Sequence, residues 1–262
     1  MSTKASLNIF DTKEELGVAL AEQIAETAQA FQKSKGYFAM ALSGGSSPRP
    51  LYEALATPPL SYKVPWSYGY FFMVDERCVP ESSKESNFKM IWECMLSHVP
   101  VFETNIFPVH FQTVDPERAA TDYEDRIKEA FKLEPGAFPA FDIVILGLGD
   151  DGHTASLFPN SDALKETERA VVANHVDRMD QDRITLTVPT LNNSEHIFFV
   201  VTGQSKADIV SKVMCATQPT YPANLIQPPK LQPQWYLDKE AASLLSPAAC
   251  HSGEGGSSTD VL

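Results

Sequence analysis

Asp151 and His153 stand two residues apart in a glycine-rich segment that directly follows an apolar run. A histidine can accept a proton near neutral pH, and a carboxylate nearby can hold its ring in one tautomer. Asp75 follows another apolar run and is the alternative partner. The pattern predicts that His153 is a catalytic base, oriented by Asp151 or by Asp75. The other histidines lack such neighbours, and we assign them no chemistry.

A second segment, residues 43–47, combines serines and glycines and precedes a predicted helix. Glycine lets the backbone approach an anion closely, and the first N–H groups of a helix point toward it. Basic side chains near other strand ends could add charge for a phosphate group. The candidate anion-binding residues are Ser43, Gly44, Gly45, Ser46, Arg49, Arg183 and Lys206. No Gly-Lys-Ser/Thr follows at the spacing of a Walker motif.

The glycines Gly147, Gly149 and Gly152 match the spacing of a dinucleotide-binding fingerprint. The residues between them argue against this function, because Asp150 and Asp151 would lie beside a pyrophosphate. Pro159 also comes too early for the long helix that usually follows. The sequence therefore predicts no nicotinamide cofactor. A metal is not expected either, because Asp151 and His153 alone are too few ligands.

The overall charge limits the partners of the chain. Its 262 residues include 34 acidic and 21 basic side chains, a formal net charge of −13. Nucleic acid and anionic membranes bind preferentially to basic protein surfaces, so neither is expected as a main partner. A small anionic ligand is still compatible with this net charge, since a few basic side chains at a site can outweigh the electrostatic field of the whole chain. The cysteines form no C-x-x-C pair, and no apolar run approaches the roughly 20 residues of a membrane span.

Strands and helices alternate along the chain and must position these groups. Apolar runs predict strands at residues 7–10, 37–42, 68–74, 141–146, 170–173, 184–187, 197–202 and 235–237. Helical spacing predicts helices from 12 to about 34, from 48 to 56, and at 87–96, 116–131, 207–214 and 239–245. The fold class is therefore α/β, a Rossmann-like three-layer sandwich with a mostly parallel central sheet. Polar clusters after Leu42, Val74, Leu146 and Thr202 should line one rim.

Local signals also predict helix starts and the domain limits. Asp11 with Glu14 fits a capping box, and Ser47 before Pro48 fits an N-cap. We expect one domain over residues 1–250 and a disordered tail at 251–262, where glycine and serine dominate. The polar N-terminus does not resemble a secretory signal, so a cytoplasmic location is expected.

Several motifs together resemble the 6-phosphogluconolactonase family over about residues 7–245. They are the segments 42–49, 74–77 with 86–88, 147–159 and 183–187; the segment Gly-Asp-Asp-Gly-His-Thr-Ala-Ser-Leu-Phe-Pro is the most specific. The resemblance implies hydrolysis of 6-phospho-D-glucono-1,5-lactone to 6-phospho-D-gluconate in the oxidative pentose phosphate pathway. It also implies a small sugar-phosphate substrate and no required cofactor. We expect a monomer or a weak dimer.

Glucosamine-6-phosphate deaminases of the same superfamily are the runner-up. They carry Asn-Glu-Pro where this chain has Leu157-Phe158-Pro159, and they lack an arginine at the position of Arg77. A sugar-phosphate sensor without catalysis is a third hypothesis. For the lactonase, Arg77 or nearby backbone N–H groups would offset charge on the substrate carbonyl oxygen. An ion pair of Arg77 with Asp75 or Glu76 is the structural alternative.

Overall fold

Seven strands form a central sheet in which every neighbouring pair is parallel. The computed structural model describes residues 6–111 and 115–245. From one edge to the other, the strands are β1 (Ser6–Phe10), β10 (Gln234–Asp238), β9 (His196–Val201), β6 (Ile143–Leu146), β2 (Phe38–Leu42), β3 (Gly69–Met73) and β5 (Ile106–Phe107). The predicted, mostly parallel α/β sheet is confirmed.

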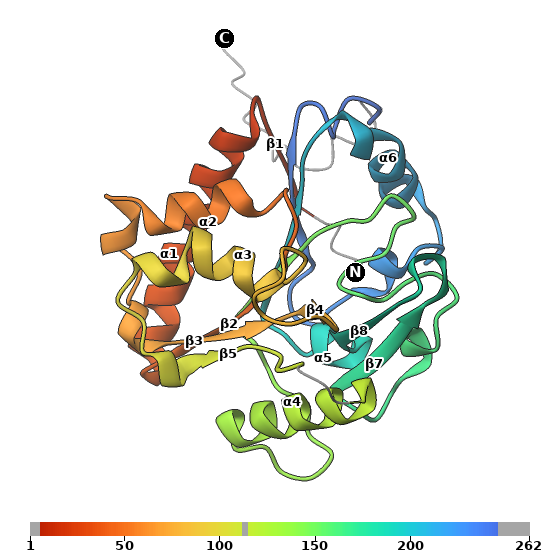
Figure 1. Ribbon diagram of the computed structural model, residues 1–262. Helices are drawn as coiled ribbons and strands as arrows, with labels where there is room; N and C mark the ends of the chain where they lie inside the picture. Colours follow the sequence, from red (N-terminus) through yellow and green to blue (C-terminus); the bar gives the residue numbers. More distant parts are fainter. Residues whose placement is uncertain (1–5, 112–114, 246–262) are drawn as a thin grey trace.

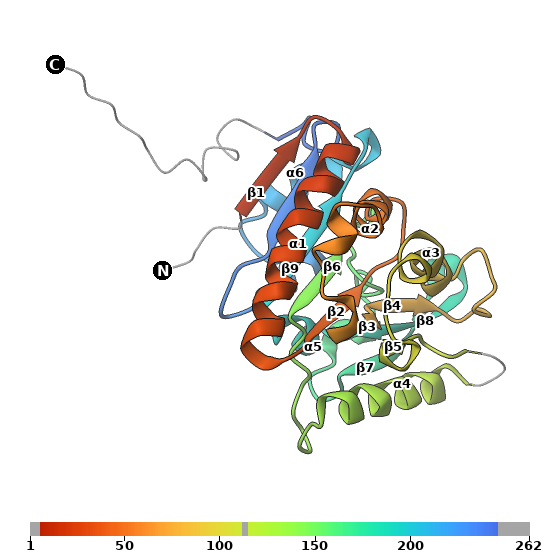
Figure 2. The ribbon, with the colours of Figure 1, turned by 90° about the vertical axis from the view of Figure 1, so that its left-hand side faces the viewer.

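The middle strands are apolar at successive positions because helices or loops cover both faces of the sheet. All residues of β2 and β6 are buried. Helices α1 (Lys13–Lys35), α2 (Arg49–Ala56) and α3 (Asn87–Cys94) lie on one side, and α6 (Ala207–Cys215) lies on the other (Figures 1 and 2). The longest helix, α1, runs along the sheet and packs against α2.

A second sheet has three antiparallel strands, β4 (Asp75–Arg77), β8 (Gln181–Leu186) and β7 (Val171–Val176). Sequence analysis predicted strands near β7 and β8 but no second sheet. Val74 joins the two sheets, since its N–H donates to Leu42 O at 3.0 Å and its carbonyl accepts from Leu186 N at 2.9 Å. The chain thus leaves β3 and enters β4 within one residue.

The remaining helices are α4 (Pro116–Phe131), α5 (Val188–Asn192) and a series of short 3₁₀ turns. These turns are η1 (Leu60–Tyr62), η2 (Trp66–Tyr68), η3 (Leu96–His98), η4 (Glu103–Asn105), η5 (Asp162–Lys165), η6 (Asp177–Met179), η7 (Gln204–Lys206) and η8 (Pro222–Leu225). None of the helices in the described ranges has the length and apolar character that a membrane crossing requires.

Three local predictions were wrong. Thr12, not Asp11, caps α1, and its hydroxyl accepts from Glu15 N at 3.1 Å. Ser47 does not cap α2; its hydroxyl instead accepts from the N–H of Thr202 at 3.3 Å, which links the turn after β2 to the residue that follows β9. Residues 239–245 form hydrogen-bonded turns rather than a helix. The predicted tail at 251–262 lies outside the described residues.

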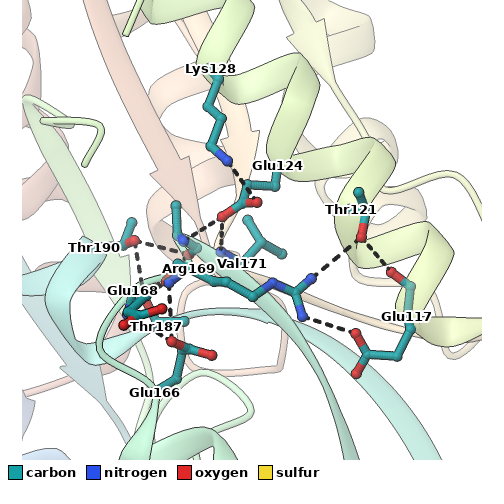
Figure 3. Close-up of polar contacts among 11 residues, drawn as sticks. Glu117, Thr121, Glu124, Lys128, Glu166, Glu168, Arg169, Val171, Thr187 and Thr190 are labelled. Carbon is teal, nitrogen blue, oxygen red and sulfur yellow. Dashed lines mark hydrogen bonds and ion pairs between the residues drawn. The ribbon is translucent and has the colours of Figure 1, made fainter. Parts of the chain in front are cut away.

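Glu124 of α4 holds this helix against the second sheet (Figure 3). Its buried carboxylate accepts from Ala170 N at 2.5 Å and pairs with Lys128 at 2.8 Å. The neighbouring pair between Arg169 and Glu117, at 2.9 Å, lies nearer the solvent. Buried acceptors that satisfy backbone donors contribute more to stability than exposed ion pairs.

We therefore expect Glu124→Ala to lower the free energy of unfolding by about 1–3 kcal/mol, because the buried N–H groups of Ala170 and Val171 lose their acceptor. Glu117→Ala is the matched control on the same helix and should cost less than about 1 kcal/mol. Urea denaturation followed by circular dichroism measures both. Equal effects of the two substitutions would contradict the role given to Glu124.

Candidate active site

A cavity of about 340 Å³ opens where the carboxyl ends of β2, β6 and β9 meet the second sheet. This size is typical of small-molecule sites. Among the residues predicted from sequence, it is lined by Ser43, Gly44, Gly45, Ser46, Asp75, Arg77, His153, Arg183 and Lys206. The structure therefore brings together the four segments that follow apolar runs, although the Asp75 segment belongs to the second sheet.

His153 and Asp151 form a close pair at the wall of this cavity. The ring Nδ1 lies 2.5 Å from Asp151 Oδ1, and the His153 backbone N–H donates to the same oxygen at 3.1 Å. The His153 side chain is 21% exposed. Because Nδ1 faces the carboxylate, Nε2 is the nitrogen that can accept a proton from another group.

Burial lowers the pKa of His153 below its ordinary value, and the hydrogen bond and charge of Asp151 offset this only in part. Asp75 also raises this pKa, whereas Arg178 lowers it further. For Asp151, burial is the largest influence and raises the pKa, but the hydrogen bonds and charge of His153, together with the charge of Arg178, outweigh it, and the net pKa lies below its ordinary value. At neutral pH the pair is thus a neutral imidazole beside an ionised carboxylate.

The glycines around His153 serve the tight backbone turn. Gly149 N donates to His153 O at 2.8 Å, and Gly152 N donates to Gly149 O at 3.0 Å. Gly152 has a φ of 79°, which favours glycine. A Cβ on Gly149 would fall 1.9 Å from His153 Nδ1. The fingerprint-like spacing is therefore explained by the need to place the imidazole ring against its own turn.

Asp75, the alternative partner of His153, bonds elsewhere. Its buried carboxylate accepts from Ser156 Oγ at 2.6 Å, and its backbone carbonyl accepts from Asn87 Nδ2 at 2.9 Å. Ser156 lies three residues after His153 in the same segment. Asp75 consequently fixes the wall of the cavity and acts on His153 through its charge.

Glu76 and Arg77 have separate surroundings. Glu76 accepts from Ser86 Oγ at 3.0 Å and from Phe88 N at 2.8 Å, so it stabilises the first turn of α3. The Arg77 guanidinium donates to the carbonyl of Glu85. Within the described residues Arg77 forms no ion pair with Asp75 or Glu76, so the structural alternative raised from sequence has no support.

Several buried polar atoms at the cavity lack a partner within residues 6–111 and 115–245. They are Ser43 Oγ, Arg77 Nε, Asn87 Oδ1 and Arg183 Nε. Buried polar groups are normally paired, because leaving one unpaired costs free energy. A polar, anionic ligand in this cavity would meet donors from both sheets.

Lys206 and Arg49 differ from expectation. Lys206 lines the cavity, but its Nζ lies 2.5 Å from Asp150 Oδ1, so a resident carboxylate already neutralises part of its charge. The structure does not bring Arg49 to the cavity; its guanidinium lies 3.6 Å from Glu53, one turn along α2.

Asn87 and Arg178 also line the cavity, although sequence analysis gave neither a role at the site. Asn87 begins α3 and contacts Asp75. Arg178 lies in η6, and its NH1 is 3.1 Å from Asp151 Oδ2. No local signal marks Arg178, because its place at the site depends on how the second sheet pairs.

Comparisons with known proteins agree on one family. The family of glucosamine-6-phosphate isomerases and 6-phosphogluconolactonases matches residues 11–235. A 6-phosphogluconolactonase of Synechocystis sp. is 40% identical over 215 residues, which cover 81% of this chain and 87% of that protein. The chloroplastic 6-phosphogluconolactonase 3 of Arabidopsis thaliana is 34% identical over 249 residues, covering 92% and 76%.

Solved structures give the same picture. The 6-phosphogluconolactonase of Trypanosoma brucei superposes with a TM-score of 0.82 at 29% identity, covering 94% of this chain and all of that one. A monomeric glucosamine-6-phosphate deaminase superposes with a TM-score of 0.75 at 21% identity, which indicates a shared fold alone.

The site predicts opposite titration behaviour for two histidines. By NMR, the His153 ring should titrate below the usual value of about 6.5. His175, whose pKa the hydrogen bond of Asp182 raises, should titrate above it. Asp151→Asn removes the group that raises the His153 pKa, so its midpoint should fall further. A His153 midpoint above the usual value, or one that ignores Asp151→Asn, would disagree with this geometry.

Proposed function

The chain belongs to the glucosamine-6-phosphate isomerase/6-phosphogluconolactonase family, and we propose that it hydrolyses 6-phospho-D-glucono-1,5-lactone to 6-phospho-D-gluconate. It is a lactone hydrolase that serves the oxidative pentose phosphate pathway. The observation that carries the proposal is the pair of Asp151 and His153, which stands at the same cavity as an anion-binding turn and several cations.

A lactone needs only a positioned base and a stabiliser of charge. His153 Nε2 takes a proton from water, and the water oxygen forms a bond to C1 of the lactone. When the tetrahedral intermediate collapses, the bond from C1 to the ring oxygen breaks and His153 returns the proton to that oxygen. Asp151 holds the ring and stabilises the imidazolium between the two steps. The net reaction adds one water and opens the ring.

The cations divide into two roles in this proposal. Arg77, whose Nε is unpaired among the described residues, offsets negative charge on the carbonyl oxygen of C1. The phosphate lies against the turn at residues 43–47, with Arg183 and Lys206 as its charged partners. Holding the distant phosphate fixes the lactone relative to the base and reduces the entropic cost of reaction.

The deaminase alternative is weaker for a specific reason. Where a deaminase carries Asn-Glu-Pro, this chain has Leu157 and Phe158, and the Phe158 ring packs 4.1 Å from the His153 ring. An aromatic ring there cannot exchange protons with a substrate amine. Ammonia release from glucosamine 6-phosphate would support the deaminase instead.

Three finer points also remain proposals. We propose a monomer or a weak dimer, a cytoplasmic location, and residues 1–250 as one domain. The Arabidopsis relative is named chloroplastic, so location varies among the relatives. Light scattering of the purified chain tests the oligomeric state, and fractionation of the cells that express it tests the location.

His153→Ala should lower kcat by about 10²–10⁴-fold, the usual contribution of a general base. The substrate should be made fresh by glucose-6-phosphate dehydrogenase, and its loss followed against a no-enzyme control, since the lactone also opens spontaneously. His98→Ala is the matched control, because His98 is an exposed histidine that contacts the backbone of Glu93. Unchanged turnover in His153→Ala would eliminate its role.

A second substitution reaches the same base without removing it. Gly149→Ala should displace the ring from Asp151, because the added Cβ would lie 1.9 Å from Nδ1. Activity should fall together with the NMR signature of the pair, while circular dichroism of the folded chain is preserved.

Lys206→Ala should mainly raise KM for the phosphorylated lactone, by on the order of tenfold for one lost charge-assisted contact. Its activity on glucono-1,5-lactone, which has no phosphate, should change little. Lys212→Ala is the control, since Lys212 lies on α6 and pairs with Asp208 at 2.6 Å. An equal loss on both lactones would contradict the phosphate assignment.

A further inference from the structure

Arg178 reaches the catalytic pair from the second sheet. It lies in η6, the tip of the hairpin between β7 and β8, whose strands pair continuously from Val171 with Leu186 to Val176 with Gln181. The tip closes with Asp180 in the left-handed conformation, at a φ of 47°. This short, fully paired hairpin gives the tip a fixed direction toward the cavity that Arg178 lines.

Two contacts tie Arg178 to the base. Its NH1 lies 3.1 Å from Asp151 Oδ2, the carboxylate oxygen that does not face His153. Its guanidinium carbon also lies 5.0 Å from the centre of the Phe158 ring, and that ring packs 4.1 Å from the His153 ring. Arg178 therefore contacts the carboxylate and the aromatic ring that bracket the base.

The choice of partner is informative, because other carboxylates lie nearer along the chain. Asp177 and Asp180 flank Arg178 in sequence, but each lies beside the His175 ring instead, with Nε2 at 3.8 Å from both carboxylates. Arg178 instead pairs with Asp151, which belongs to the turn after β6. An arginine that only stabilised the hairpin would be expected to pair with a carboxylate of the hairpin itself.

We propose that Arg178 is a positioning residue, which holds the outer oxygen of Asp151 and covers Phe158 so that the pair of Asp151 and His153 keeps its reactive geometry. This inference rests on the proposed lactonase function and deepens it. With one carboxylate oxygen hydrogen-bonded to Nδ1 and the other ion-paired with Arg178, rotation of Asp151 away from Nδ1 during the proton transfers is opposed. In the proposed site the phosphate is assigned to the turn at residues 43–47, Arg183 and Lys206, and Arg178, which lines the same cavity, is assigned to Asp151.

The charges that face His153 set the direction of the pH effect. Asp151 on its own turn and Asp75 on β4 favour the imidazolium, whereas Arg178 on the hairpin disfavours it. At the rim, the Lys206 charge is paired with Asp150. Removing the charge of Arg178 should raise the pKa of His153, so the acid limb of kcat/KM should move to higher pH.

The test compares Arg178→Gln, which removes the charge, with Arg178→Lys, which keeps it. In Arg178→Gln we expect kcat to fall on the order of tenfold, KM to stay nearly constant, and the acid limb to move up. Arg178→Lys should restore the position of the acid limb. Arg118→Gln is the matched control, because Arg118 is 72% exposed on α4 and pairs within its own helix.

An NMR titration of His153 in the same variants gives a readout independent of turnover, so the positioning role and the lactonase activity can fail separately. Three results would overturn the role. One is a His153 midpoint in Arg178→Gln equal to that of the wild type. Another is a rise of KM alone, which would make Arg178 a substrate-binding residue. The third is equal loss in both variants with no movement of the acid limb, which would indicate a structural role only.

Discussion

The buried carboxylate of Asp75 is the contact on which the cavity depends. It accepts a hydrogen bond from Ser156, which lies in the segment of His153. The backbone carbonyl of Asp75 also accepts from the side chain of Asn87 at the start of α3. A buried carboxylate is costly unless such donors satisfy it, so the three segments must fold together. Glu76 beside it binds the first N–H groups of α3 in the same way. Asp75 and Glu76 thereby connect the His153 segment, α3 and the second sheet into one wall of the cavity.

The two sheets supply different chemistry to this wall. The parallel sheet contributes the ends of β2, β6 and β9, where backbone turns can approach an anion and where His153 lies. The antiparallel sheet contributes guanidinium groups: Arg77 and Arg183 face each other as register partners on β4 and β8, and Arg178 stands at the hairpin tip. A chain with a net charge of −13 thus concentrates cations at one place, which attracts an anionic sugar phosphate locally.

Sequence alone predicted the parallel sheet and the pair of His153 with Asp151, because both depend on short-range patterns. Apolar runs such as residues 141–146 mark buried strands, and a two-residue spacing in a glycine turn keeps a carboxylate near the ring. The second sheet was not predictable in this way. Its key pairing, Arg77 with Arg183, joins residues far apart in sequence, and an apolar run does not specify its partner strand. The same limit hid Arg178. Arg49 was misplaced for a different reason, because it pairs locally with Glu53, one turn along α2.

The balance of charge around His153 supports the proposed mechanism, in which one site binds an anion and keeps its base neutral. Burial and the arginine at the hairpin tip keep the imidazole neutral, which a base requires before it takes a proton from water. In the proposed mechanism, the imidazolium formed by proton transfer needs a counter-charge, and the Asp151 carboxylate lies 2.5 Å from the ring. Arg178 forms an ion pair with the outer oxygen of that carboxylate, so its charge acts on Asp151 as well as on the His153 ring. In the proposed mechanism, the cation that disfavours imidazolium in the resting state therefore also fixes the group that would stabilise imidazolium during the reaction.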